Sequence, residues 1–505
     1  MAQSAHGMLE TRANAAASVA RTATALILTA VVTVAVFLPT RHNGFLEAGF
    51  DDQLITDDPD IPHLDAARAW SLATSFRHAN YVPLTMLSFQ LQYPLSGFRP
   101  AHYHLVNIFL HAATAVLLWL FLRPLVRSVW LATLAALIFA VHPMQLEAVS
   151  LAIQRKTLLS GLLLFVALIA YQRWRAHRSR VAYGVSLLAF VSAAAAKPTV
   201  VTLPLVLLLY DAVFVGGRPR LLDKLPYFAV AGIFSLAATA ASHAVGAIYP
   251  PHGGSWVGHV LVAARAMADC CAALVLPVAL SPVYYYRAGT QYGPLNVLAL
   301  AALVLLVGLV TARRRQYPWA FFCVWWFALT ILPQSNVFPL AQLRPDRYAY
   351  LSLVGFALGV AVALDHLARR LPRRWRFTSP LGGALYVALL ATLTANSIAV
   401  WRDDVSAWQR VVARNAWCAV AHMMLGRVYD ARGDVAHAEH AYLDATRVQP
   451  SVAEPYLHLA RLYAAHGGPD RARDAAQRFL DRAPDHPARA EMSRLLGTEA
   501  ISTTQ

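Results

Sequence analysis

Long apolar segments, separated by short polar loops, recur along most of this chain and restrict it to few folds. A helix needs about 20 mainly apolar residues to cross the hydrocarbon core of a bilayer. Of the 505 residues, 58% are hydrophobic and only 14% are charged. We therefore predict an all-α polytopic membrane protein. About eleven segments qualify as spans, namely 22–40, 103–122, 129–146, 157–172, 181–196, 199–215, 224–246, 293–312, 317–333, 347–366 and 379–400.

The basic residues lie in short clusters between the apolar segments. These clusters carry much of the formal net charge of +16. They predict cytoplasmic loops of a membrane protein and argue against a nucleic-acid partner. We expect residues 1–21 to form an N-terminal cytoplasmic tail and residues 22–400 to form the transmembrane domain. The clusters are Arg173 to Arg175, Arg178 to Arg180, Arg218 to Lys224, Arg313 to Arg315 and Arg369 to Arg376.

One apolar segment, 257–280, decides the topology because it also carries Arg265 and Asp269. If this segment crossed the membrane, the two basic clusters that follow it would lie outside. If it lies in the outer interface instead, both clusters fall inside, as the positive-inside rule requires. We therefore predict about eleven spans, an interfacial segment 257–280 and an outside C-terminus.

Two adjacent carboxylates, Asp51 and Asp52, follow the first apolar segment in a long outer loop, 41–102. Ionisable groups at a membrane face are costly to hold there and are often functional. A carboxylate in this place could take the proton from an attacking hydroxyl. We expect at least one of the two to be a catalytic base. The stretch Asp57–Pro59, in contrast, suggests a solvated turn.

A second outer loop, 141–156, carries charge beside two predicted spans. Arg155 and Lys156 suit an anionic phosphate group, and His142 and Glu147 stand at the same boundary. We predict that these four residues contribute to a site. The alternative is that the basic side chains snorkel to the interface beside a capped helix end.

A third outer loop, 333–350, contains Arg344, Asp346, Arg347 and Tyr348. Its positive charges run against the positive-inside trend, so we predict that they contact a phosphate or a sugar. The alternative is a local Asp346–Arg347 ion pair of little energetic value.

For two more charged residues, the sequence allows either a functional or a structural role. Lys197 lies near an outer boundary, and Arg265 lies in the ambiguous segment. Charge buried in lipid is expensive and therefore functional by default. A single lysine at a boundary can also snorkel.

The motifs of nucleotide and metal chemistry are missing from the sequence. There is no phosphate-binding loop of the G-x-x-x-x-G-K type and no His/Cys set with metal-ligand spacing. The four cysteines build no disulfide framework. We therefore expect no cofactor. The residues alone leave metal dependence open, and only the family resemblance given below favours a site with no metal. Nucleotide sugars do not reach an enzyme on the outer face. The energy for sugar transfer must therefore come from the donor substrate itself, and a lipid-linked sugar phosphate would meet that need.

Composition changes after Trp401, where charge rises and a period of 34 residues begins. We predict a C-terminal tetratricopeptide-repeat domain over 401–505, with repeats at 419–452 and 453–486. Two repeats are too few to be stable alone, so flanking helices around 404–414 and 488–496 would complete or cap the stack. The repeat positions are Leu425, Gly426, Tyr429, Ala438, Tyr442, Ala445 and Pro450, then Leu459, Ala460, Tyr463, Ala472, Ala476, Phe479 and Pro484.

Three motifs occur in a characteristic order ahead of these repeats. They are Phe50-Asp51-Asp52, then His142-Pro143-x-x-x-Glu147-Ala148-Val149 leading to Arg155, then Asp346-Arg347-Tyr348-x-Tyr350. Together they resemble the transmembrane and tetratricopeptide-repeat-containing O-mannosyltransferases. More broadly they resemble the GT-C glycosyltransferases, which include the protein O-mannosyltransferases. The resemblance covers nearly the whole chain.

The resemblance implies a GT-C fold, a polyprenyl-phosphate-linked sugar donor and an inverting transfer to a hydroxyl. Asp51 or Asp52 would be the base, and Arg155 and Arg347 would lie near the donor phosphate. We expect a glycosyltransferase of an inner membrane, with its active site and repeats on the periplasmic side. It would move a mannose-like hexose to a protein or glycan acceptor, and the repeats would hold that acceptor or a partner protein.

Three other functions stay open. An O-antigen-type oligosaccharide ligase or polymerase should depend on outer-loop Arg and His residues more than on Asp51 and Asp52. A transporter should carry charges at the membrane midplane, whereas the charges here lie at boundaries. A non-catalytic scaffold that presents repeats should tolerate substitution of both aspartates.

Overall fold

The computed structural model describes residues 2–497 except 78–79, 217–219, 248, 288, 373 and 375–377, with side chains from residue 17 onward. Arg218, Arg373 and Arg376 of the predicted basic clusters lie outside the described residues, as do the side chains of tail residues 1–16. The described chain is 77% helical and contains no β-strand. The predicted all-α class is confirmed.

The chain divides into two compact units. The membrane unit comprises Met1–Phe45, Asp52–Leu280 and Arg287–Ile398, and the C-terminal unit comprises Leu46–Asp51, Ser281–Tyr286 and Ala399–Gln505. Two short segments from the predicted outer loops therefore belong to the C-terminal unit, which sequence periodicity gave no reason to expect.

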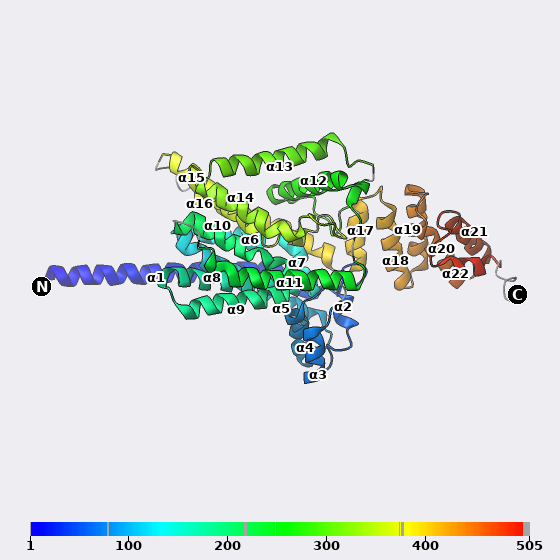
Figure 1. Ribbon diagram of the computed structural model, residues 1–505, viewed down its shortest axis with the longest axis horizontal. Helices are drawn as coiled ribbons and strands as arrows, with labels where there is room; N and C mark the ends of the chain where they lie inside the picture. Colours follow the sequence, from blue (N-terminus) through cyan, green and yellow to red (C-terminus); the bar gives the residue numbers. More distant parts are fainter. Residues whose placement is uncertain are drawn as a thin grey trace. The chain divides into compact units, whose positions relative to one another are not determined.

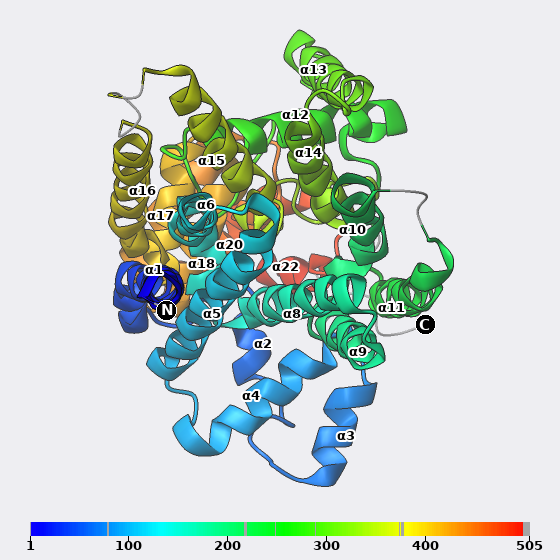
Figure 2. The ribbon, with the colours of Figure 1, turned by 90° about the vertical axis from the view of Figure 1, so that its left-hand side faces the viewer.

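Twelve of the described helices make up the body of the membrane unit, and α1, α11 and α13 run in a similar direction (Figure 1). Figure 2 views this unit along α1, with α5 and α6 beside it. The bounds are α1 (Ala2–Phe37), α5 (Pro100–Val126), α6 (Val129–Val141), α8 (Arg155–His177), α9 (Arg180–Ala196), α10 (Leu203–Tyr210), α11 (Leu225–Ala244), α12 (Trp256–Val275), α13 (Pro294–Ala312), α14 (Pro318–Ile331), α15 (Leu353–Arg370) and α16 (Thr378–Ser397).

Eight described helices are long and apolar enough to cross a membrane, and a bent pair makes a ninth. The total is fewer than eleven. The helices Arg180–Ala196 and Pro318–Gln334 are apolar but short, and α15 is absent from the set, whereas α12 is included. α12 is among the eight by length and composition, so its interfacial location stays a prediction. The eight are Ala17–His42, Pro100–Val126, Ala152–His177, Pro198–Val215, Leu222–Ala244, Trp256–Val275, Pro294–Ala312 and Thr378–Trp401.

The bent pair is the local feature that positions the candidate site. α6 is apolar on all sides and is buried from Leu131 to Val141, as expected of a helix surrounded by others. Pro143 then interrupts the helical hydrogen bonding. The chain turns by 53° into the segment Pro143–Ser150, whose last part is the short helix α7 (Leu146–Ser150).

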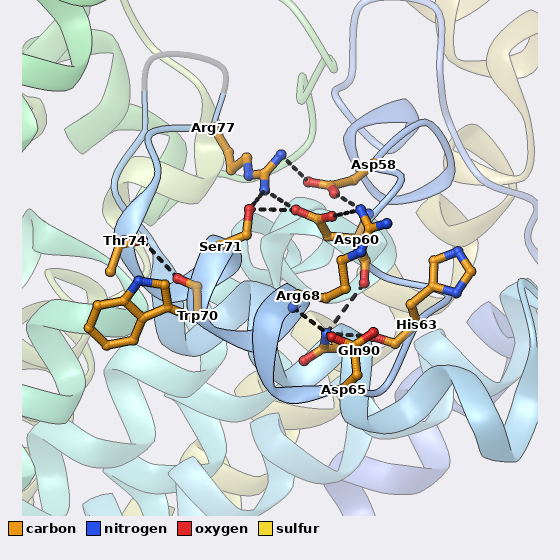
Figure 3. A network of polar contacts seen from close by, with 10 residues as sticks. All are labelled: Asp58, Asp60, His63, Asp65, Arg68, Trp70, Ser71, Thr74, Arg77 and Gln90. Atoms are coloured by element: carbon orange, nitrogen blue, oxygen red, sulfur yellow. Dashed lines mark hydrogen bonds and ion pairs between the residues drawn. The ribbon is translucent and has the colours of Figure 1, made fainter.

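The first outer loop contains three helices, α2 (Gln53–Thr56), α3 (Ala66–Thr74) and α4 (Pro83–Ser96). A network of polar contacts joins the segment after α2 to α3 and α4 (Figure 3). The Asp60 carboxylate accepts hydrogen bonds from Ser71 at 2.7 Å, Arg68 at 2.8 Å and Arg77 at 2.5 Å. Arg77 also lies 3.5 Å from Asp58.

The prediction of a solvated turn at Asp57–Pro59 was therefore wrong for Asp58. Asp58 and Asp60 are 4% and 5% exposed. The Asp58 carboxylate accepts a hydrogen bond from the Asp60 backbone N–H at 2.9 Å. Only Asp57 and Pro59 point outward. Arg68 and Arg77, 10 and 19 residues after Asp58, supply the positive charge of this network. A turn prediction from local sequence does not include such distant partners.

Substituting Asp60 with asparagine should loosen this loop. The Ser71 hydroxyl, with Arg68 and Arg77, holds the pKa of Asp60 at about 2, against 3.8 ordinarily. Because the folded-state pKa is lowered, the stabilisation is present above about pH 4 and is lost as pH falls toward 2. The shift corresponds to about 2 kcal/mol.

Limited proteolysis should show faster cleavage within the loop of Asp60→Asn at pH 7, and acid should loosen the wild-type loop similarly. Asp57→Asn, at an exposed position, serves as the control, and equal cleavage rates in the two variants would contradict the expectation.

The C-terminal unit is built from helix pairs after α17 (Asp404–Arg414). The pairs are α18 (Ala419–Ala431) with α19 (Val435–Val448), and α20 (Glu454–Ala465) with α21 (Pro469–Leu480), followed by α22 (Arg489–Leu495). Small residues at predicted repeat positions let the paired helices approach. A Cβ on Gly426 would meet the Tyr442 ring at 2.5 Å. The assignment to tetratricopeptide repeats stays a prediction.

Within this unit, the segment Leu46–Asp51 packs on α17. The Trp408 indole N–H donates to the Ala48 carbonyl at 2.7 Å, and the Ala48 N–H donates to Asp404 at 3.2 Å. The Phe50 ring lies 5.5 Å from the Trp408 ring. The aromatic residue of the Phe50-Asp51-Asp52 motif is thus a packing residue.

Candidate active site

Asp52 is completely buried in the membrane unit. It begins α2, and its Oδ1 accepts a hydrogen bond from the Ile153 backbone N–H at 2.8 Å. Ile153 lies in the 3-10 turn Ala152–Gln154, which leads directly into α8. Unpaired N–H groups at a helix start favour a negative charge. The fold therefore holds this carboxylate where its charge is stabilised.

Asp51 has different surroundings although it is the next residue. It ends the short segment that belongs to the C-terminal unit, is half-buried and has a φ of +72°. A positive φ is uncommon for residues other than glycine, and aspartate and asparagine tolerate it best. Asp51 therefore has a conformational reason to be an aspartate that Asp52 lacks.

Glu147 and Arg347 form a buried ion pair. The Arg347 guanidinium pairs with Glu147, and the Arg347 backbone N–H donates to the Glu147 carboxylate at 2.8 Å. Arg347 Nη2 also donates to Gln342 at 3.2 Å. Glu147 is only 2% exposed. Two residues 200 positions apart thus join α7 to the 3-10 turn Asp346–Ala349, and the two predicted loops meet.

Arg155 points toward α4 and α5. Its guanidinium donates to Gln92 at 2.5 Å and to Asn107 at 3.4 Å. It also lies 4.4 Å from the centre of the Phe89 ring. The residue is 1% exposed, and within the described residues its partners are neutral oxygens and rings. Lys156, the next residue, is 8% exposed and acts electrostatically on Lys197.

His142 is fully buried at the bend after α6. The Met144 backbone N–H donates to its Nδ1 at 3.2 Å, so Nε2 carries the proton and donates to the Leu274 carbonyl at 3.0 Å. Both ring nitrogens are therefore occupied by backbone groups. In this structure His142 fixes the bend against the last turn of α12.

Arg344 and Tyr348 line a small, partly open hollow in the membrane unit. Arg344 Nη2 lies 3.7 Å from the carboxylate of Asp346, which is buried. One face of α12 supplies the opposite wall with small and apolar side chains. Such a lining suits a ligand that combines an anionic head with a hydrocarbon chain. The other lining residues are Ala263, Ala266, Met267, Cys270, Ile331, Gln334, Ser335, Leu343 and Pro345.

Several residues around the site were not among the predicted site residues, although Tyr350 belongs to the third motif. The Tyr350 hydroxyl and His111 Nδ1 lie 2.9 Å apart in the core, and His111 Nε2 bonds to the Ala140 carbonyl at 2.9 Å. A histidine inside an apolar segment was the available signal. Gln92 and Asn107, the partners of Arg155, gave none, because neutral amides in helices are unremarkable in a sequence.

The charged residues of the candidate site gather in one part of the membrane unit. α7 contacts the turn Ala152–Gln154, the start of α8 and the turn Asp346–Ala349. Asp52, Glu147, Lys156 and Arg347 all lie on or against these elements. Among the described residues, no group of three or more His, Cys, Asp or Glu side chains could hold a metal ion. The fold and the site define a polytopic α-helical membrane protein with a buried polar centre.

Comparison with known proteins shows which proteins this chain is similar to. No protein-family model matches the chain. It is 41% identical over 103 residues to mouse protein O-mannosyl-transferase TMTC1, a match that covers 20% of this chain and 11% of that protein. It is 32% identical over 164 residues to Drosophila melanogaster protein O-mannosyl-transferase Tmtc1, covering 32% and 19%. It is 40% identical over 96 residues to human protein O-mannosyl-transferase TMTC3, covering 19% and 10%.

These matches confirm the resemblance to the transmembrane and tetratricopeptide-repeat-containing O-mannosyltransferases. The matched stretches span between about a tenth and a fifth of each relative's length. The similarity is thus local and strong.

Proposed function

We propose that this protein is a membrane glycosyltransferase that transfers a sugar to a hydroxyl group of a protein. The donor would be a polyprenyl-phosphate-linked, mannose-like hexose, and the reaction would take place on the outer face of an inner membrane. The observation that carries the proposal is the buried Asp52 carboxylate against the start of α8, the helix that also begins with Arg155 and Lys156. The names of the relatives support the reaction class.

In the proposed reaction, the acceptor oxygen attacks the anomeric carbon of the donor sugar while Asp52 takes the hydroxyl proton. The bond between that carbon and the phosphate oxygen breaks, and its electron pair leaves with the polyprenyl phosphate. Attack opposite the leaving group inverts the anomeric configuration. Cations placed at the leaving phosphate would stabilise the charge that develops there.

The hollow beside Arg344 is the proposed binding site for the lipid end of the donor. Its apolar α12 wall would contact the isoprenoid chain, and Arg344 would face the phosphate. Glu147 and Asp346 would hold Arg347 and Arg344 in place, and Tyr348 would line the entrance. We further propose that the helix pairs of the C-terminal unit bind the acceptor protein, because stacked helix pairs form concave binding surfaces.

The test is transfer of radiolabelled sugar from synthetic polyprenyl-phosphate mannose to protein in membranes that contain the full-length chain. Donors with glucose or galactose on the same lipid identify the sugar. Transfer to protein that needs the chain supports the proposal. Lack of transfer from every donor, with normal accumulation of the protein, would favour the scaffold or ligase alternative.

A further inference from the structure

Lys197 is a buried lysine without a carboxylate partner in the described part of the chain. It follows the end of α9, is 9% exposed, and its Nζ donates to the Thr157 hydroxyl at 2.9 Å. Thr157 in turn donates its proton to Gln154 at 2.8 Å. An ammonium group has three N–H donors, and the described contacts use one of them.

Lys224 shows how this fold treats a buried lysine elsewhere. It is fully buried at the opposite end of the bundle and pairs directly with the carboxylate of Asp211. Arg175 and Asp223 complete that balanced group. The buried ammonium of Lys224 is thus neutralised by an adjacent carboxylate, whereas Lys197 has none among the described contacts.

The charges that face Lys197 make its isolation more costly. Lys156 and Arg347 repel it, and Glu147, which attracts it, is already paired with Arg347. Burial and then these two cations lower the pKa of Lys197 well below its ordinary value, and Glu147 opposes the shift. Burying an ammonium without a counter-ion is strongly unfavourable. An anion bound beside Lys197 would offset this repulsion.

We propose that Lys197 binds the phosphate group of the lipid-linked donor, together with Lys156. This inference rests on the proposed function. It assigns a role to Lys197, for which the sequence allowed either a functional or a structural role. A phosphate offers several acceptor oxygens to the remaining N–H donors. In the transfer step, the donor phosphodiester becomes a phosphate monoester as the sugar leaves. Its negative charge rises, so Lys197 contributes more to the transition state than to donor binding.

A pH signature follows from this role. Binding of the anion raises the lowered pKa of Lys197, so the donor binds together with a proton. Donor affinity should fall by up to tenfold per pH unit between the free and bound pKa values as pH rises. An arginine at this position stays charged, so Lys197→Arg should flatten the profile. Lys197→Met should also remove the pH dependence of donor binding, with weak affinity at every pH.

The experiment measures binding of undecaprenyl phosphate to the purified full-length protein in detergent, and sugar transfer in parallel. Lys197→Met should weaken binding about 10- to 100-fold, as expected for loss of a charged hydrogen bond, and should lower kcat as well. Thr157→Val is the matched control, because it removes the hydrogen bond to Lys197 and keeps the ammonium. It should keep the wild-type pH profile. Inorganic phosphate at the same concentration distinguishes a lipid-linked ligand from a free anion.

The outcomes separate this inference from the proposed function. Wild-type binding of undecaprenyl phosphate that depends on Lys197, without any sugar transfer, would support the site and overturn the function. Transfer by Lys197→Met with wild-type kcat, KM and pH profile would overturn the site and leave the function standing. Binding of inorganic phosphate but not of the lipid would overturn the donor assignment. Loss of thermal stability alone, equal in Lys197→Met and Thr157→Val, would reduce Lys197 to a structural role.

Discussion

Asp52→Asn is expected to lower sugar transfer by 10²- to 10⁴-fold, the range typical of removing a general base. Asparagine is nearly isosteric with aspartate, and its side-chain oxygen can still accept the Ile153 N–H that Asp52 Oδ1 accepts at 2.8 Å. The variant should therefore fold and accumulate normally, and the loss should fall on kcat. The measurement is steady-state transfer in membranes, normalised to the amount of protein.

Asp51→Asn is the matched control for this experiment. Asparagine tolerates the φ of +72° at this position as well as aspartate does, so transfer should stay within about threefold of wild type. Asp52→Ala should lose stability in addition to activity, by about 1–3 kcal/mol, because it leaves the buried Ile153 N–H unpaired. If Asp51→Asn lost activity and Asp52→Asn kept it, the base would be Asp51. If neither lost activity, the ligase or scaffold alternative would be favoured.

Much of the helical architecture could be predicted from the sequence, for a physical reason. Long apolar segments such as Pro294–Ala312 can be recognised without any partner, because the bilayer sets their length. Helices whose apolar runs are shorter or interrupted are harder to place. α15, where a span over 347–366 was predicted, is absent from the long apolar set, and α12 belongs to that set although it carries Arg265 and Asp269.

The candidate site could be predicted as a list of residues but not as an arrangement. The sequence indicated charges at membrane boundaries, including Glu147 and Arg347. Their pairing across 200 residues depends on the bend at Pro143 and on helix packing that no local pattern encodes. The same limit applies to Asp60 and to Arg155, whose partners lie on other elements. His142 shows the converse, because a residue type that suggests chemistry can be used to hold two backbone segments together.

Breaking the Glu147–Arg347 pair is expected to destabilise the membrane unit by about 3–5 kcal/mol. Glu147 is 2% exposed, so Arg347→Met would leave a buried carboxylate without the guanidinium that pairs with it. It would also weaken the attachment of the turn Asp346–Ala349 to α7, leaving the hydrogen bond from the Arg347 backbone N–H to Glu147. The free energy of unfolding, followed by thermal unfolding and protease resistance in detergent, should fall strongly in Arg347→Met and in Glu147→Gln.

The double variant Glu147→Gln/Arg347→Met separates structure from chemistry. It removes both charges, so no unpaired charge stays buried, and it should recover part of the stability that either single variant loses. Arg369→Met is the control, because the exposed Arg369–Asp365 pair should contribute less than about 1 kcal/mol. If the double variant recovers stability and transfer together, the pair is purely structural. If it recovers stability while transfer stays low, then Arg347 also acts on the donor. Equal stability losses in the single and double variants would show that the ion pair does not hold the two loops together, since the neutral pair would then behave like a lone charge.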